Sequence, residues 1–228
     1  KPKNLIFASP VKPDIRLSNA VDNDIEVISN GDSVLIYEEP IGDSGLTWKD
    51  LQGWWSTNRR ITDPGEAKKT LYLRLKDSLP STSPPQKWFF EAYHRCFSRD
   101  IPTLPALLPE VWLHWDHKTV QERGADALLR FRMDFLMLLP NRVRVVLEID
   151  GKQHYADTDG RADPNRYAKM VLADREQRLA GYEIYRFGAS ELGSEASARS
   201  VANEFFQALF DRHHIAYSSP DTGATAGV

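Results

Sequence analysis

Two stretches of alternating apolar and charged residues, 130–139 and 143–152, constrain the fold of this chain most strongly. Successive side chains of a β-strand point to opposite faces of the sheet. In both stretches the odd-numbered positions carry no charge, whereas the even-numbered positions include Arg, Asp, Glu and Lys. The stretches are therefore predicted to be paired strands joined across residues 140–141, with one face in the core and the other face charged.

The charged face of this strand pair brings acids from both strands together. A tight hairpin about residues 140–141 sets Asp134 opposite Glu148 or one position away, and Asp150 and Lys152 follow on the same face. Like charges directly across a ladder destabilise it. A fold that keeps such a pair favours a cation between the carboxylates, and hard divalent ions such as Mg²⁺ or Mn²⁺ take oxygen ligands.

We therefore expect Asp134, Glu148 and Asp150 to bind a divalent metal and to form a catalytic centre with Lys152. Such a group can orient and deprotonate a water and neutralise charge that grows on a phosphate. Alternating charges can also form the solvated face of a half-exposed sheet. Both sheet faces tend to be covered in an α/β fold, which favours the catalytic interpretation.

The distribution of periodic apolar segments and of proline-rich or polar stretches along the chain predicts a mobile leader, a small N-terminal α/β module, a main domain and a mobile tail. These four segments span residues 1–24, 25–80, 83–215 and 216–228, respectively. In the module, Asn30-Gly31 between two short apolar runs predicts a β-hairpin. Thr47, with Asp50 at the capping-box position, predicts the start of a helix.

The main domain is predicted to have the element order α-β-β-β-α-β-α from Ser83 onward. Its second helix is expected over about 165–180 and ends at Gly181, which suits a left-handed C-cap. A strand over 182–187 follows. A helix that returns the chain to a parallel neighbouring strand is the usual way to extend such a sheet.

The combined pattern resembles the PD-(D/E)XK superfamily of restriction-like and repair nucleases. The resemblance is carried by Asp134, the strand pair and the run Glu148-Ile149-Asp150-Gly151-Lys152, and then by His154, Asp174-Arg175, Gly181-Tyr182 and Arg186-Phe187. The longer pattern is similar to bacterial domains related to very-short-patch-repair endonucleases. It covers about residues 84–212 and implies a restriction-endonuclease-like αβββαβ core, a mixed central sheet flanked by helices.

The resemblance also implies roles for individual residues. Asp134 would be the first metal ligand and Lys152 the lysine of the motif, with Met133 in the place of the nominal proline. Glu148 and Asp150 both suit the second acidic position, and both are kept.

Two further residues acquire candidate roles through this resemblance. His154 is expected to act as an acid or base near neutral pH, or else to be a structural polar histidine. Glu91 stands where the superfamily often carries an accessory acid, with a plain surface glutamate as the alternative.

Basic residues cluster around the predicted site although the net charge of the chain is −3. Arg130, Arg132, Arg144 and Arg175 are the candidate contacts to nucleic acid, because arginines that bind phosphates supply affinity without reading sequence. Acids interleave in the helix that carries Arg175, so a solvated amphipathic surface is the alternative there.

The composition excludes several other classes of protein. A single cysteine, Cys96, excludes an intrachain disulfide and a cysteine-rich zinc site. No apolar run approaches the roughly 18 residues that span a bilayer. The apolar stretch near the start is too short for a signal peptide. A cytoplasmic protein without a membrane partner is expected.

Together these features predict a divalent-metal-dependent endonuclease that acts on DNA in preference to RNA, in bacterial repair or defence. A catalytically silent nucleic-acid-binding or assembly module on the same fold is one alternative, and an RNA-cleaving toxin is another. The retained acids argue against the silent module, because a decayed site loses its costly buried charges first. A homodimer, or a protein partner bound through the N-terminal module, is also considered.

Overall fold

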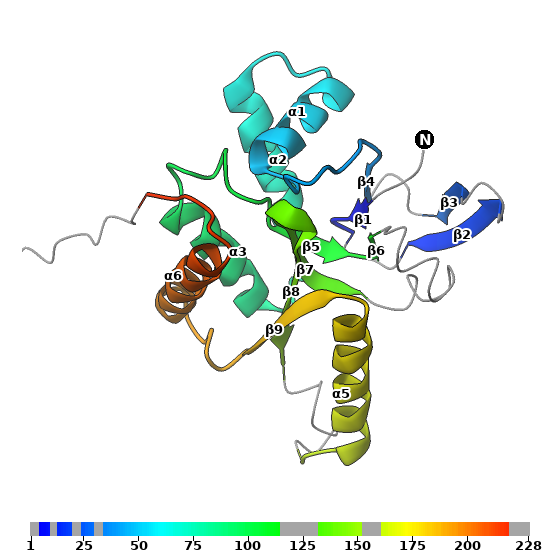
Figure 1. Ribbon diagram of the computed structural model, residues 1–228, viewed down its shortest axis with the longest axis vertical. Helices are drawn as coiled ribbons and strands as arrows, with labels where there is room; N and C mark the ends of the chain where they lie inside the picture. Colours follow the sequence, from blue (N-terminus) through cyan, green and yellow to red (C-terminus); the bar gives the residue numbers. More distant parts are fainter. Residues whose placement is uncertain are drawn as a thin grey trace, which may run out of the picture.

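Figure 1 shows the computed structural model of the chain, which describes residues 5–9, 13–19, 24–29, 34–114, 132–151 and 161–218. It is a mixed α/β structure. The strands are β1 (Leu5–Phe7), β2 (Asp14–Asn19), β3 (Asp24–Ser29), β4 (Leu35–Tyr37), β5 (Leu108–Val111), β6 (Leu113–His114), β7 (Met133–Leu138), β8 (Arg144–Asp150) and β9 (Tyr182–Gly188). The α-helices are α1 (Trp48–Arg59), α2 (Pro64–Asp77), α3 (Pro84–Cys96), α5 (Pro164–Leu179) and α6 (Glu195–Arg212).

A four-stranded mixed sheet with the order β5-β7-β8-β9 lies at the centre of the structure. The pairs β5–β7 and β7–β8 are antiparallel, and β8–β9 is parallel. Parallel neighbours need a crossover connection, and α5 supplies it between β8 and β9. The strand pair predicted from the alternating segments is therefore confirmed, with a short 3-10 turn at Pro140–Arg142 between the strands.

The two faces of the central sheet have different coverings. Phe89 of α3 packs against Phe135 and Phe187 of the sheet and against Phe206 of α6. On the other side, α5 runs alongside β9, and Asp174 of α5 reaches Arg186 of β9. Figure 1 shows α3 and α6 together on one side of the sheet and α5 on the other. The apolar face of the central sheet thus packs against α3 and α6, and the charged face lies on the side of α5.

The N-terminal strands differ from the predicted leader and hairpin. Strand β1 is completely buried and pairs with both β4 and β6, so residues 5–7 are part of the core sheet and not of a leader. Strand β3 pairs with β2, whereas β4 pairs with β1, so the hairpin predicted about Asn30-Gly31 is wrong. The backbone groups of a buried apolar strand need partners, and β1 obtains them along both edges.

Helix α1 begins where its predicted cap places it, and α2 also begins at a capping residue. Thr47 and Asp50 form the reciprocal capping box of α1, and Asp63 accepts a hydrogen bond from the Glu66 backbone at the start of α2. The buried residues of α1 and α2 belong to the same hydrophobic cluster as those of the central sheet and α3. The stretch at 80–83 is thus a turn over a shared core. No helix in the described part of the chain is long and apolar enough to cross a membrane.

Gly45 is expected to be essential for the attachment of the N-terminal part to β7. Its φ is +77°, and the next residue, Leu46, donates a backbone hydrogen bond to the Leu138 carbonyl at 3.0 Å. A Cβ on residue 45 would overlap that carbonyl. Gly45→Ala should lower the free energy of unfolding by about 2 kcal/mol or more in urea denaturation, since both the positive φ and the close backbone approach disfavour it.

Gly53→Ala is the matched control for this experiment. Gly53 lies within α1 with open space around its Cα. Alanine should raise the free energy of unfolding by roughly 0.5–1 kcal/mol there, because glycine is a poor helix former. Equal stability of Gly45→Ala and wild type would contradict the proposed attachment.

Candidate active site

The register of the central sheet places four charged residues in one row across its strands. The pairing on both sides of Glu110 in β5 sets it opposite Asp134 in β7. The β7–β8 register, continued by one residue, sets Asp134 opposite Glu148, as the sequence predicts. Glu148 is paired in turn with Arg186 of β9. We call Glu110, Asp134, Glu148 and Arg186 the charged row.

Asp134 is fixed from two sides in this row. Its side chain is 3 % exposed. One carboxylate oxygen accepts a hydrogen bond from Arg132 Nη2 at 2.9 Å, and the other accepts one from the Ile149 backbone N–H, also at 2.9 Å. The second bond crosses from β7 to β8. The orientation of Asp134 is therefore set by the sheet itself as well as by the arginine.

Glu148 is the least compensated acid at the centre of the row. It is 8 % exposed, and no side chain or backbone group in the described residues donates a hydrogen bond to it. Burial raises the pKa of Glu148 well above its usual range, and the charges of Asp134 and Asp150 raise it further. Arg186 and Arg132 oppose this rise. Glu148 therefore holds a proton more readily than an ordinary glutamate.

Asp150 is held by a two-pronged contact with Arg186. The guanidinium donates from Nε and Nη2 to the two carboxylate oxygens at 2.7 and 2.8 Å. The third nitrogen, Nη1, lies 3.5 Å from Asp174 of α5, and Asp174 also accepts a hydrogen bond from Arg178 at 2.8 Å. Charge-assisted bidentate pairs of this kind are strong and directional. They join β8, β9 and α5 at the edge of the site.

Glu110 is a functional candidate that the sequence reasoning missed. It is completely buried, its φ is +48°, and neither carboxylate oxygen has a hydrogen-bond partner among the described residues. Arg132 Nε lies 3.3 Å from Oε2, which makes an ion pair without hydrogen-bond geometry. Burial raises the pKa of Glu110 to about 7; Asp134 adds to the rise and Arg132 opposes it.

Strained backbone and unsatisfied buried groups cluster at functional sites, and Glu110 combines both features. A signal in the sequence was available. Glu110 is a lone charged residue within the otherwise uncharged stretch 101–113.

The acids of the site outnumber the cations that contact them. Among the described residues, five carboxylates and three guanidinium groups come together there, which leaves a formal excess of two negative charges. The acids are Glu110, Asp134, Glu148, Asp150 and Asp174, and the cations are Arg132, Arg178 and Arg186. Uncompensated buried charge is costly, and buried acids respond by retaining protons.

The acids do not converge on one point in this arrangement. Within the described ranges, no three His, Cys, Asp or Glu side chains lie close enough together to hold a metal ion. Asp134 is turned to Arg132 and Asp150 to Arg186. A divalent cation would compete with these arginines for the same oxygens.

Several predicted site residues lie outside the charged row or outside the described part of the chain. Lys152, His154 and Arg130 fall outside the residues that the structure describes. Arg132 is part of the site, where it pairs with acids and lies 5.9 Å from the Trp112 ring centre.

Arg144 has structural contacts instead. It donates to the Ala180 carbonyl at the end of α5 and lies 4.5 Å from the centre of the Tyr182 ring. Gly181, between these two residues, has the left-handed φ of +87° that its predicted C-cap role requires.

Arg175 and Glu91 differ in their relation to the charged row. Arg175 is exposed on α5, the helix that faces the charged side of the sheet. Glu91 belongs to α3, which covers the opposite, apolar face, and its carboxylate pairs with Lys76 at 2.5 Å. The structure therefore does not bring Glu91 together with the acids that it was expected to assist.

A substitution at Glu110 should expose the energetic cost of its burial. Because the pKa of Glu110 is higher in the folded state than its ordinary value of 4.5, binding of the proton stabilises the folded state. This stabilisation is complete below pH 4.5 and is lost as the pH rises through about 7. Glu110→Gln should therefore be more stable than wild type by about 1–3 kcal/mol at pH 8, with the difference shrinking toward pH 5. Urea denaturation across this pH range measures it. A variant less stable than wild type at pH 8 would contradict this account of Glu110.

The chain was also compared with known proteins. No family model matches it, and neither the curated proteins nor the solved structures include a significant match.

Proposed function

We propose that this chain is a divalent-metal-dependent nuclease that hydrolyses phosphodiester bonds, with Asp134, Glu148 and Asp150 as the metal ligands. The observation that carries the proposal is the formal excess of two negative charges that the described residues leave around the charged row. A divalent cation carries the charge that would balance this excess, and carboxylate oxygens are the ligands that Mg²⁺ and Mn²⁺ prefer.

The donor set fits such an ion on chemical grounds. Glu148 offers a buried carboxylate to which none of the described residues donates a hydrogen bond, and Asp134 lies across the ladder from it. A bound Mg²⁺ or Mn²⁺ would supply an activated water and neutralise charge on the scissile phosphate. Asp134 would keep its orientation through the Ile149 N–H. Arg186, released in part from Asp150, would retain Asp174 as a partner.

Lys152 and His154 complete the proposed centre. Lys152 would place an ammonium group beside the phosphate, where it stabilises negative charge in the transition state. His154 would donate or accept a proton near neutral pH. Both follow β8, which carries Glu148 and Asp150 on its last three residues. Their roles are part of the proposal and follow from their position in the sequence.

The finer fold assignment is proposed together with the function. The elements α3, β5, β7, β8, α5 and β9 follow one another in the order αβββαβ, with the short β6 added after β5 in another sheet. The mixed sheet and its crossover helix support a restriction-endonuclease-like core. DNA is the proposed substrate, and the exposed Arg175 on α5 is the preferred phosphate contact.

A catalytically silent nucleic-acid-binding module is the second candidate. The observation that favours it is the pairing of Arg132 with Asp134 and of Arg186 with Asp150, which gives two of the acids cationic partners without a metal. Such a site can be stable without catalysis, since paired buried charges persist for structural reasons.

Cleavage assays test the proposal directly. Supercoiled plasmid and labelled single strands of DNA and RNA are incubated with Mg²⁺, Mn²⁺ or EDTA. Wild type should cut DNA with metal and not with EDTA. Asp134→Asn and Lys152→Ala should each lower the rate by roughly 100-fold or more, the scale on which loss of a transition-state contact acts. Nicked or linear product reports whether one strand or both are cut.

Asp77→Asn is the matched control for these variants. Asp77 is an exposed acid at the end of α2, away from the charged row. The Asp77→Asn variant should cleave DNA at the same rate as wild type. Cutting of RNA alone would favour a toxin. No cutting of either substrate with any metal would favour the silent module, and cutting that survives both active-site substitutions would show that another site is responsible.

Metal binding gives a second test that does not depend on turnover. The raised pKa of Glu148 means that a proton competes with the metal, so Mn²⁺ affinity should increase between pH 6 and pH 8. The expected gain is up to about tenfold per pH unit for each proton released. Isothermal titration calorimetry measures it.

Glu148→Gln should weaken Mn²⁺ binding and flatten its pH dependence, while Asp77→Asn should leave both unchanged. Any slope that remains in Glu148→Gln is expected from Glu110, whose pKa is about 7. Equal Mn²⁺ affinity in wild type and Glu148→Gln would exclude Glu148 as a ligand.

A further inference from the structure

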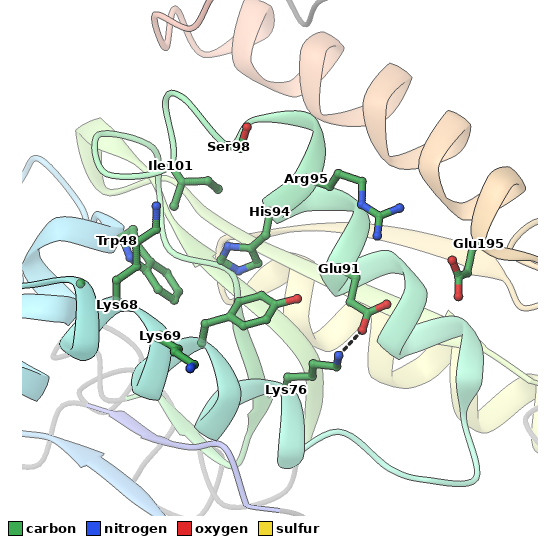
Figure 2. Close-up of a pocket in the computed structure, with 12 residues that line it drawn as sticks. Trp48, Lys68, Lys69, Lys76, Glu91, His94, Arg95, Ser98, Ile101 and Glu195 are labelled. Atoms are coloured by element: carbon green, nitrogen blue, oxygen red, sulfur yellow. Dashed lines mark ion pairs between the residues drawn. The ribbon is translucent and has the colours of Figure 1, made fainter. Parts of the chain in front are cut away.

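A cavity lies among helices α1, α2 and α3, and none of its lining residues belongs to the charged row. Its volume is about 530 Å³, and its walls also include the loop after α3 and the start of α6. This volume lies within the range of pockets that bind small molecules, roughly 300–1,000 Å³. Figure 2 shows the lining side chains.

The floor of the cavity is aromatic and uncharged. The ring of His94 lies at its centre, in edge contact with Trp48 and Tyr72 at centroid distances of 4.8 and 5.0 Å. Burial lowers the pKa of His94 to about 3, and the charge of Lys68 adds to this effect. His94 is thus neutral at physiological pH, and its Nε2 has no hydrogen-bond partner in the described part of the chain. The floor is therefore an aromatic surface that carries one buried ring nitrogen.

The rim of the cavity is cationic. Lys68 and Lys69 of α2 and Arg95 of α3 are exposed and make no ion pair within the described residues. Lys76 is neutralised by Glu91, the ion pair drawn as a dashed line in Figure 2. With Glu195 as the other acid, the lining carries four cations against two acids. Positive charge is therefore in excess around an aromatic floor.

We propose that this cavity binds a mononucleotide, with its phosphate against Lys68 and Lys69 of α2 and its base against the aromatic floor around Tyr72 and His94. Unpaired ammonium and guanidinium groups are the side chains that bind phosphate. Aromatic faces provide the stacking surface that any base can use. A simple inorganic anion would use the rim and leave the floor empty, whereas a nucleotide uses both.

This assignment is independent of the proposed nuclease centre. The cavity belongs to the layer of α3, which covers the apolar face of the central sheet, and the charged row belongs to the other face. The Lys76–Glu91 pair lies in the wall of the cavity. Glu91, which was expected to assist the acids of the nuclease centre, instead neutralises one of the cations that line this second site.

Isothermal titration calorimetry on the full chain at low ionic strength tests the proposal. The probes are AMP and CMP, with adenosine and inorganic phosphate as partial ligands. AMP should bind at least roughly tenfold more tightly than either partial ligand, because it uses both the rim and the floor. Binding should weaken with added NaCl, as expected for contacts between exposed charges.

Two variants locate the binding site. Lys68→Ala combined with Lys69→Ala should weaken AMP binding roughly tenfold or more, since two exposed cations are removed without disturbing the core. Lys87→Ala is the matched control, because Lys87 is an exposed lysine of α3 that does not line the cavity. It should bind AMP like wild type. The same holds for Asp134→Asn, which separates this site from the nuclease centre.

Three results would overturn the proposal. They are the absence of heat with either mononucleotide at millimolar concentration, equal affinity for AMP and inorganic phosphate, and wild-type affinity in the double lysine variant. Loss of AMP binding in Asp134→Asn would place the ligand at the charged row instead. A negative cleavage assay leaves all of these outcomes unaffected, so failure of the proposed function and failure of this site are distinguishable.

Discussion

The bidentate contact between Arg186 and Asp150 is the interaction on which the rest of the site depends. One guanidinium group holds the end of β8, the middle of β9 and, through Asp174, the crossover helix α5. Helix α5 has one buried residue, Gln177, so apolar packing contributes little to its position. Polar contacts replace that packing: Arg178 also donates to the Ile184 carbonyl at 3.2 Å. Loss of the Arg186 charge would leave neighbouring acids uncompensated, which costs more than the contact itself contributes.

The strand pair and its register could be predicted because three independent features agree. The period-2 pattern identifies both strands, the charged positions select one face, and the short turn at Pro140–Arg142 fixes the offset. A shift by one residue would turn Asp134 and Glu148 into the apolar face. The caps at Thr47 and Asp63 were equally predictable, because they involve contacts within one turn of helix.

The features that could not be predicted depend on contacts between distant segments. Asn30-Gly31 is a good local signal for a turn, but it says nothing of which strands pair on either side. The role of Glu110 depends on its place beside Asp134, which only the β5–β7 register provides. Likewise, the pairing of Asp150 with Arg186 depends on the folded chain, which places β8 beside β9. The pattern in the sequence places several arginines near the acids without pairing them.

The pairing of β1 with β6 has a consequence for how the chain reaches its native state. These strands lie more than one hundred residues apart in sequence, and Ala8, which directly follows β1, donates a backbone hydrogen bond to the Pro109 carbonyl of β5. Such distant pairing gives the fold a high contact order, which slows folding because a long loop must close first. During synthesis β1 can pair early with β4, but its other edge stays without a partner until the segment around residue 114 has left the ribosome. Removal of the first 80 residues would leave the complementary edges of β5 and β6 open to aggregation.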